Sequence, residues 1–136
     1  MRFNEISTID DYGLTLSAHG NNTYSSETKI FLDFNNLTEN SFTNLSFSNP
    51  NQNKIEYNLE SNQLKSLPKN IFENLMTESN STSLFVVANQ FKCDCDMKWI
   101  YEMQNLDKNR INSLLCINKN NTYLFKLNNT DFEKCT

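Results

Sequence analysis

The stretch NQFKCDCDMKWIYEM, residues 89–103, decides how this chain is interpreted. Cys93 and Cys95 have a single residue between them, and a disulfide joining them would close a ring too small for relaxed geometry. Each therefore needs a distant partner, and Cys116 and Cys135 are the only other cysteines in the chain. Spacing alone permits three connectivities among four cysteines.

The residues after Cys95 predict a short helix. Asp96 is placed to cap it, and Trp99 follows Cys95 by one helical turn, so that its ring can lie over that sulfur. The largely apolar face of the helix would consist of Met97, Ile100, Tyr101 and Met103. The stretch therefore predicts a small lid that disulfides tie in place.

The same residues resemble a known family. The pattern Asn-x-Phe-x-Cys-Asp-Cys-x-x-x-Trp, with two cysteines downstream, is similar to the C-terminal cap of extracellular leucine-rich-repeat proteins, including Slit-like, Toll-like and secreted arthropod members. The resemblance covers Leu84 to Cys135. The tail after Cys116 is most similar to caps of arthropod proteins that resemble the non-catalytic subunit of Oplophorus luciferase. In the family the first cysteine pairs with the third and the second with the fourth, which implies Cys93–Cys116 and Cys95–Cys135 here.

Four cysteines with none left over favour an oxidising compartment. A zinc site of four thiolates is the alternative, but structural zinc usually takes CxxC-type pairs. The intervening gaps here are one, twenty and eighteen residues. The sequence therefore predicts disulfides and no bound metal.

Three segments upstream and within the cap repeat one pattern: residues 30–37, 57–64 and 84–91. Their asparagines, Asn35, Asn62 and Asn89, are separated by two equal intervals, and four apolar columns coincide with them. The pattern L-x-L-x-x-N-x-L at a fixed period of this size is typical of leucine-rich repeats. Its alternating part predicts a short strand with inward apolar side chains, so that successive segments stack as a parallel sheet.

The three asparagines are expected to form a ladder. Where the chain leaves each strand, backbone N–H and C=O groups lose their partners in the sheet, and a buried amide can satisfy them. Behind the second strand, Pro68, Phe72 and Leu75 predict a convex side that fills the core. The first repeat is three residues shorter before its Phe42, and we expect a loop at residues 49–54.

The start of the chain is interpreted as the back half of another repeat. Met1 would occupy an apolar strand position and Asn4 a ladder position, farther from Asn35 than the repeat interval, with residues 17–27 absorbing the excess. Residues 1–16 contain no apolar run typical of an export signal, and no segment is long enough to span a membrane. We therefore expect a truncated part of a longer protein.

The strand side chains that alternate with the core predict an exposed, concave binding face. Exposed aromatic and aliphatic groups beside carboxylates suit a protein ligand or a partner subunit. The predicted face consists of Phe31, Asp33, Phe34, Asn58, Glu60, Ser61, Phe85 and Val87.

Other chemistry has little support in the sequence. A net charge of −4 without a basic cluster argues against nucleic acid. His19 is the only histidine and lies in a turn-like stretch, and the pairs Asp10–Asp11 and Asp94/Asp96 resemble loop or capping residues rather than glycosidase carboxylates. We expect no enzyme activity and no cofactor.

Six Asn-x-Ser/Thr sequons are candidate glycosylation sites if the protein is exported. Their number is close to chance for a chain so rich in asparagine. The candidate residues are Asn21, Asn36, Asn44, Asn80, Asn120 and Asn128.

Together these patterns predict an α/β solenoid: leucine-rich repeats over residues 1–83, the first truncated or irregular, and the last strand with a one-helix cap over residues 84–136. The expected function is a non-catalytic extracellular or secreted protein-interaction module. The alternative is a structural end-piece that terminates a longer solenoid whose ligand binds upstream.

Overall fold

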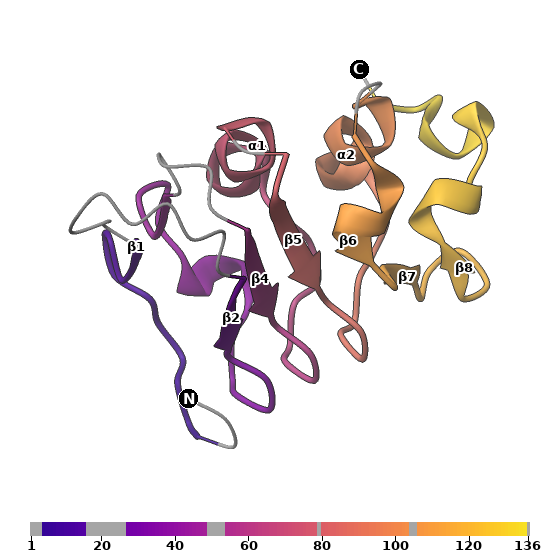
Figure 1. Ribbon diagram of the computed structural model, residues 1–136. Coiled ribbons are helices and arrows are strands. Elements are labelled where there is room, and N and C mark those ends of the chain that lie inside the picture. Colours follow the sequence, from indigo (N-terminus) through magenta and orange to yellow (C-terminus); the bar gives the residue numbers. More distant parts are fainter. Residues whose placement is uncertain (1–3, 16–26, 49–53, 79, 104–105, 136) are drawn as a thin grey trace.

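The computed structural model describes residues 4–15, 27–48, 54–78, 80–103 and 106–135. Within them the chain is a mixed α/β structure with a small parallel sheet (Figure 1). The predictions for Met1, His19, Asn21 and most of the expected loop at 49–54 fall outside the described residues.

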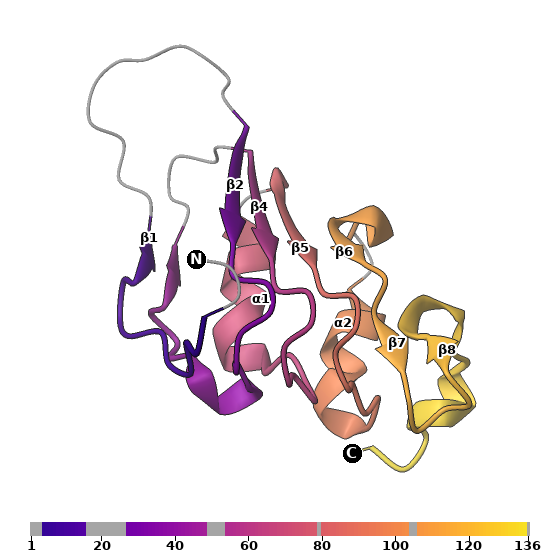
Figure 2. The same cartoon turned by 90° about the horizontal axis from the view of Figure 1, so that it is seen from below.

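The main sheet has four strands in the order β2 (Thr28–Phe31), β4 (Ile55–Asn58), β5 (Thr82–Phe85) and β6 (Ile111–Asn112). All of its pairings are parallel, so the predicted parallel sheet is confirmed. Thr28 pairs with Ile55, Ile55 with Thr82, and Leu84 with Ile111, so one constant sequence offset relates each strand to the next. The strands therefore fan out side by side in both views (Figures 1 and 2).

The inner side chains of these strands form the core. Ile55, Tyr57 and Leu84 are fully buried, whereas Glu56 between the first two is partly exposed. This alternation is what a strand with one covered face requires.

The helix α1 (Lys69–Glu78) connects β4 to β5 and closes the core behind them. It begins directly after Pro68, whose carbonyl accepts hydrogen bonds from the N–H groups of Ile71 and Phe72. Its buried residues are Ile71, Phe72, Leu75 and Met76. The spacing of these residues places them on one face of the helix.

The connection from β2 to β4 contains no α-helix among its described residues. It consists of a 3-10 helix, Glu39–Ser41, that a Thr38–Ser41 capping box opens, followed by β3 (Phe47–Ser48). β3 pairs in parallel with β1 (Leu14–Thr15) on the N-terminal side of the molecule (Figure 2). This connection is as long as the one that contains α1, since the same offset relates both strand pairs, but its phenylalanine, Phe42, lies three residues closer to the preceding strand.

Aromatic rings compensate for the missing helix. Phe47 lies 5.0 Å from the ring of Tyr57 and 5.2 Å from that of Phe72, and Phe42 lies 5.6 Å from Phe72. Edge-to-face and tilted contacts of this kind are favourable beyond simple burial. Aromatic side chains therefore fill the space behind the β2–β4 connection, whereas the helix α1 fills it in the β4–β5 connection.

The cap is more irregular than the sequence predicts. A 3-10 helix, Cys95–Met97, precedes a five-residue helix α2 (Lys98–Glu102), so the predicted helix is present but short. The capping role expected for Asp96 is wrong: Met97 is the N-cap of α2, with no side-chain cap, and Asp96 lies inside the 3-10 turn. The chain tightens immediately after Cys95, which moves the start of the helix toward the C-terminus.

The rest of the cap is a hairpin and three further 3-10 helices. β7 (Leu115–Cys116) pairs antiparallel with β8 (Thr122–Tyr123). Asn120 and Asn121, at the end of the loop 117–121, both have positive φ angles, 52° and 53°, which is typical of the central residues of a type I′ turn. The 3-10 helices are Lys108–Arg110, Leu124–Lys126 and Asn129–Phe132.

Arg110 ties the cap to the helix and the sheet. Its side chain is buried, and its Nη2 and Nε atoms donate hydrogen bonds to the carbonyls of Met76, in the last turn of α1, and Thr82, at 3.0 and 2.8 Å. Burial lowers the pKa of Arg110 from its usual value, and the nearby carboxylate of Asp107 opposes this. A cation is favourable at the C-terminal end of a helix, where carbonyl groups have no partners within the helix.

Candidate interaction surface

A coil is used here for one strand of the main sheet together with the connection that follows it. The asparagines at the ends of the strands hold successive coils together. Oδ1 of Asn62 accepts a hydrogen bond from Leu37 N at 3.0 Å, and its Nδ2 donates to the carbonyls of Leu32 and Leu59 at 2.9 and 3.1 Å. One amide therefore joins its own coil to the coil before it. Both of its polar atoms are used, as the ladder interpretation requires.

Asn89 repeats this arrangement one coil later. It accepts from Leu64 N at 3.0 Å and donates to the carbonyls of Leu59 and Val86, each at 2.9 Å. Asn35 accepts from Ile6 N at 3.2 Å. Since Ile6 stands in the same relation to Asn4 as Leu37 does to Asn35, the segment before β1 lies in the register that the sequence predicts for Asn4.

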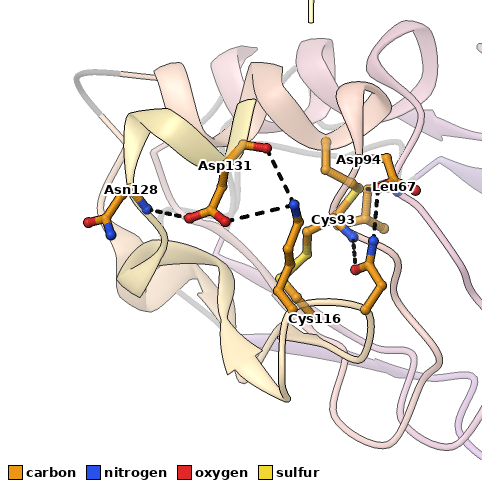
Figure 3. The surroundings of a disulfide bond; sticks show 9 residues. Leu67, Cys93, Asp94, Cys116, Asn128 and Asp131 are labelled. Carbon is orange, nitrogen blue, oxygen red and sulfur yellow. Dashed lines mark hydrogen bonds and ion pairs between the residues drawn. A yellow bond between two sulfur atoms is a disulfide. The ribbon is translucent and has the colours of Figure 1, made fainter. Parts of the chain in front are cut away.

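Asn118 has a related role that the sequence reasoning missed. Its Oδ1 accepts from Cys93 N at 2.9 Å, and its Nδ2 donates to Oδ1 of Asp94 at 2.8 Å (Figure 3). Asn118 lies in the hairpin, at a spacing from Asn89 that departs from the repeat interval, so the period could not have indicated it.

Each of the three strand-to-turn transitions has the same backbone shape. Phe34, Ser61 and Ala88, immediately before the three ladder asparagines, have φ angles of 55°, 54° and 56°. This left-handed conformation disfavours residues with a Cβ atom. The three positions therefore share one backbone conformation although their side chains differ.

The outer face of the sheet carries exposed aromatic groups. Phe31 is 38% exposed and Phe34 is 41% exposed, while Phe85 and Val87 are half-buried. Phe31 and Phe85 flank Asn58 in one register column, because Phe31 pairs with Asn58 and Asn58 with Phe85. Glu60 and Ser61 are also partly exposed near this face.

The structure does not place Asp33 and Asn58 on the exposed face, so the sequence-based assignment of these two is corrected. Asp33 is 0% exposed, because β2 ends at Phe31 and the in-and-out alternation does not extend to residue 33. Asn58 is 8% exposed, and its Oδ1 accepts from Glu60 N at 3.0 Å. Its amide thus stabilises the turn that follows β4, and its side chain lies between those of Phe31 and Phe85 in the register column.

Charges on this face are only partly balanced. Lys29 and Glu56, neighbours across β2 and β4, form an ion pair at 3.8 Å. Glu60 has no ion pair among the described residues. Within the described part of the chain, the face therefore combines apolar rings with a carboxylate that forms no ion pair.

A small hollow continues this face toward the cap. Its volume is about 90 Å³. It is lined by Val86, Val87, Ala88, Asn89, Phe91, Ser113, Leu115 and Tyr123. It is smaller than the ~150 Å³ cavity that holds benzene in an engineered protein, so an aliphatic side chain is the size of group that it can take.

A larger hollow of about 470 Å³ lies in the cap, lined by Tyr101, Glu102, Lys108, Phe125, Leu127 and Asn129. Nζ of Lys108 lies 5.6 Å from the centre of the Phe125 ring, a cation–π contact. The residues that line this hollow do not pair a nucleophile with a base.

The cap contains two disulfides, Cys93–Cys116 and Cys95–Cys135, which are the pairs that the family resemblance implies. Cys93 and Cys116 are fully buried, and Figure 3 shows the two residues side by side. Trp99 is also buried, and its Nε1 donates to Leu67 O at 2.9 Å. The tryptophan thus anchors the cap to the turn before α1.

The five described sequon asparagines are all exposed: Asn36, Asn44, Asn80, Asn120 and Asn128. Asn36 accepts a hydrogen bond from Gln63 Nε2 at 3.3 Å, and Asn128 caps the last 3-10 helix. In the described parts of the chain, no cluster of three His, Cys, Asp or Glu residues could hold a metal ion.

No helix in the described segments has the length and apolar character that crossing a bilayer requires. A scan against protein-family models and a search of curated proteins find no match to this chain.

Proposed function

We propose that the chain is a non-catalytic, extracellular protein-interaction module, built as a short leucine-rich-repeat solenoid with a disulfide-bonded C-terminal cap. The observation that carries the proposal is the exposed aromatic face of the parallel sheet, centred on Phe31, Phe34 and Phe85. Rings of this kind, rimmed by polar groups, are typical of protein-binding surfaces.

The repeat architecture is supported by three features that recur at one constant interval: the strand register, the left-handed residue after each strand, and the asparagine that joins two coils. The extracellular location is supported by the two disulfides, since such bonds persist in oxidising compartments. Glycosylation at the exposed sequons would accompany that location.

The partner would contact the face through apolar side chains and a cation. Phe31, Phe34 and Phe85 offer apolar area, the hollow beside Val87 accepts an aliphatic group, and Glu60 offers a carboxylate. Aromatic anchors with adjacent polar groups supply most of the affinity in such interfaces.

The test is a selection against the immobilised 136-residue chain from a displayed library of secreted-protein fragments. Selected binders are then measured against Phe31→Ala and Phe85→Ala. Tyr12→Ala is the matched control, because Tyr12 is a 63% exposed aromatic in the turn before β1, away from the main sheet. We expect each sheet variant to weaken binding at least tenfold, in the range of an interface hot spot, and the control to leave it unchanged.

Binding that both phenylalanine variants leave intact would place the site elsewhere. A selection that yields no specific binder would favour the alternative, a structural end-piece whose parent binds its ligand upstream.

A further inference from the structure

The two disulfides of the cap differ in their exposure to solvent. Both sulfurs of Cys93–Cys116 belong to fully buried residues that are part of the core. In the second bond, Cys95 is exposed and Cys135 is partly exposed. A reductant can therefore contact one bond in the folded protein but not the other.

Two hollows lead to the exposed bond. One, of about 290 Å³, is lined by both Cys95 and Cys135, together with Asp94, Lys119, Thr130 and Lys134 among others. The other, of about 300 Å³, reaches Cys135 from the side of α2, past Lys98 and Tyr101. Each has room for a small thiol beside the cysteines that line it.

Charge does not block this approach. Two ion pairs, Lys119–Asp131 at 3.7 Å and Lys98–Glu102 at 3.3 Å, offset part of the charge around the bond, while Asp94, Glu133 and Lys134 line the same hollows. Exchange requires attack by a thiolate, which a concentrated acidic field would repel. These groups leave only a slight excess of negative charge, so steric access is the feature that separates the two bonds.

We propose that Cys95–Cys135 is a site of thiol–disulfide exchange with a dithiol reductant, while Cys93–Cys116 stays oxidised in the folded protein. A thiolate of the dithiol attacks one sulfur, forms a mixed disulfide and releases the other cysteine as a thiolate. The second thiol of the reductant then displaces the first cysteine and closes its own disulfide. Two electrons pass to the protein, and the two protons of the dithiol end on Cys95 and Cys135.

Reduction would release the C-terminal segment and leave the repeats closed. Without the bond, residues 128–135 keep the burial of Phe132 against Tyr101, at 5.0 Å between ring centres, and the Lys119–Asp131 ion pair. They also keep the hydrogen bonds from the Tyr101 hydroxyl to Asn129 Oδ1 and from Lys98 Nζ to Cys135 O. The sheet side of the cap keeps Cys93–Cys116, the Asn118 contacts and the Arg110 hydrogen bonds. The exposed bond thus governs the tail alone.

The experiment treats the folded, oxidised chain with increasing dithiothreitol, quenches with N-ethylmaleimide and maps adducts by mass spectrometry. We expect adducts at Cys95 and Cys135 first, with Cys93–Cys116 reduced at least about tenfold more slowly, since a buried bond waits for the fold to open. Hydrogen exchange on the singly reduced protein should rise over residues 128–135 and stay unchanged in β4 and β5.

The control is the same reaction in concentrated guanidinium chloride, where the two bonds should react at similar rates. A second variant, Cys95→Ser with Cys135→Ser, should keep the remaining bond as protected as in the oxidised chain. The proposal is overturned if both bonds disappear together in native buffer, if Cys93–Cys116 reacts first, or if the remaining bond of the serine variant loses its protection.

Discussion

At the scale of single residues, Asn62 is the side chain on which the stacking of coils most clearly depends. Replacing it by Leu leaves Leu37 N without its partner in a buried site and removes one of the two amides that donate to the Leu32 carbonyl. We expect Asn62→Leu to lower the free energy of unfolding by about 1–3 kcal/mol, the cost of unsatisfied buried groups. Urea denaturation measures this. The matched control is Asn74→Leu on the exposed side of α1, expected to change stability by less than about 0.5 kcal/mol.

Ala88 tests the backbone shape that the three turns share. Its φ of 56° suits glycine, and its side chain is exposed, so Ala88→Gly removes a steric cost without losing burial. We expect a gain of about 0.5–1 kcal/mol in the midpoint analysis of urea unfolding. Ser83→Gly, at an extended position in β5, should instead destabilise by a similar amount. If both variants changed the free energy of unfolding in the same direction, the assignment of strain to Ala88 would be contradicted.

Tyr57 makes stability depend on pH. Burial raises the pKa of Tyr57 from 10.0 to about 12, and its hydroxyl donates to Leu14 O at 3.3 Å. A raised pKa means that the folded state holds the proton more tightly, so this stability is present below pH 10 and is lost as the pH rises toward 12. We expect a loss of about 1.4 kcal/mol between about pH 8 and pH 11, measured by urea unfolding. In Tyr57→Phe that loss should disappear.

At the scale of elements, the β7–β8 hairpin depends on the type I′ turn at the end of its loop, residues 117–121. Asn121 has a φ of 53°, and Thr122 N donates to Lys119 O at 3.0 Å across the turn. Asn121→Gly, which gives the preferred Asn-Gly pair, should be neutral or slightly stabilising. Asn121→Val should destabilise by about 1–2 kcal/mol, because a branched side chain opposes this conformation. Thermal unfolding of the two variants checks the turn type, and a valine variant as stable as the glycine one would contradict it.

The same elements show what the sequence could predict and where it stopped. The strands were predictable because Ile30, Tyr57 and Leu84 recur with their flanking asparagines at one period. The hairpin and β6 were not, since two-residue strands carry too few side chains for a pattern. Asp33 was misplaced for a related reason: alternation was extended past the end of a four-residue strand.

Two residues of the cap, Arg110 and Asn118, could be identified only from the folded structure. Arg110 and Asn118 lie in an irregular part of the cap, and only the folded chain brings them to Met76 and Cys93. Their residue types carry no local signal that separates a buried partner from a solvated side chain. Phe31 and Phe85, in contrast, could be assigned to one column from sequence because the period fixes the register.

At the scale of the whole molecule, the core is one continuous cluster from Ile9 to Phe132. β4 and β5 each have a strand on both sides, whereas β7 pairs only with β8 among the described strands. Amide exchange should therefore be slowest in β4 and β5 and faster in the hairpin. Similar protection in the two regions, measured by native-state exchange, would contradict this ranking.

The constant register has a consequence for how the chain can be lengthened. Residues 55–81 begin on β4 and end where β5 begins, and both strands meet their neighbours with the same offset. A second copy of this block, inserted in tandem after Ser81, would present each adjoining coil with the surface that it already contacts. Such an elongated protein should fold with one more strand and one more copy of α1, whereas an inserted block that is a single residue shorter or longer would put the asparagine amides out of reach of their carbonyls.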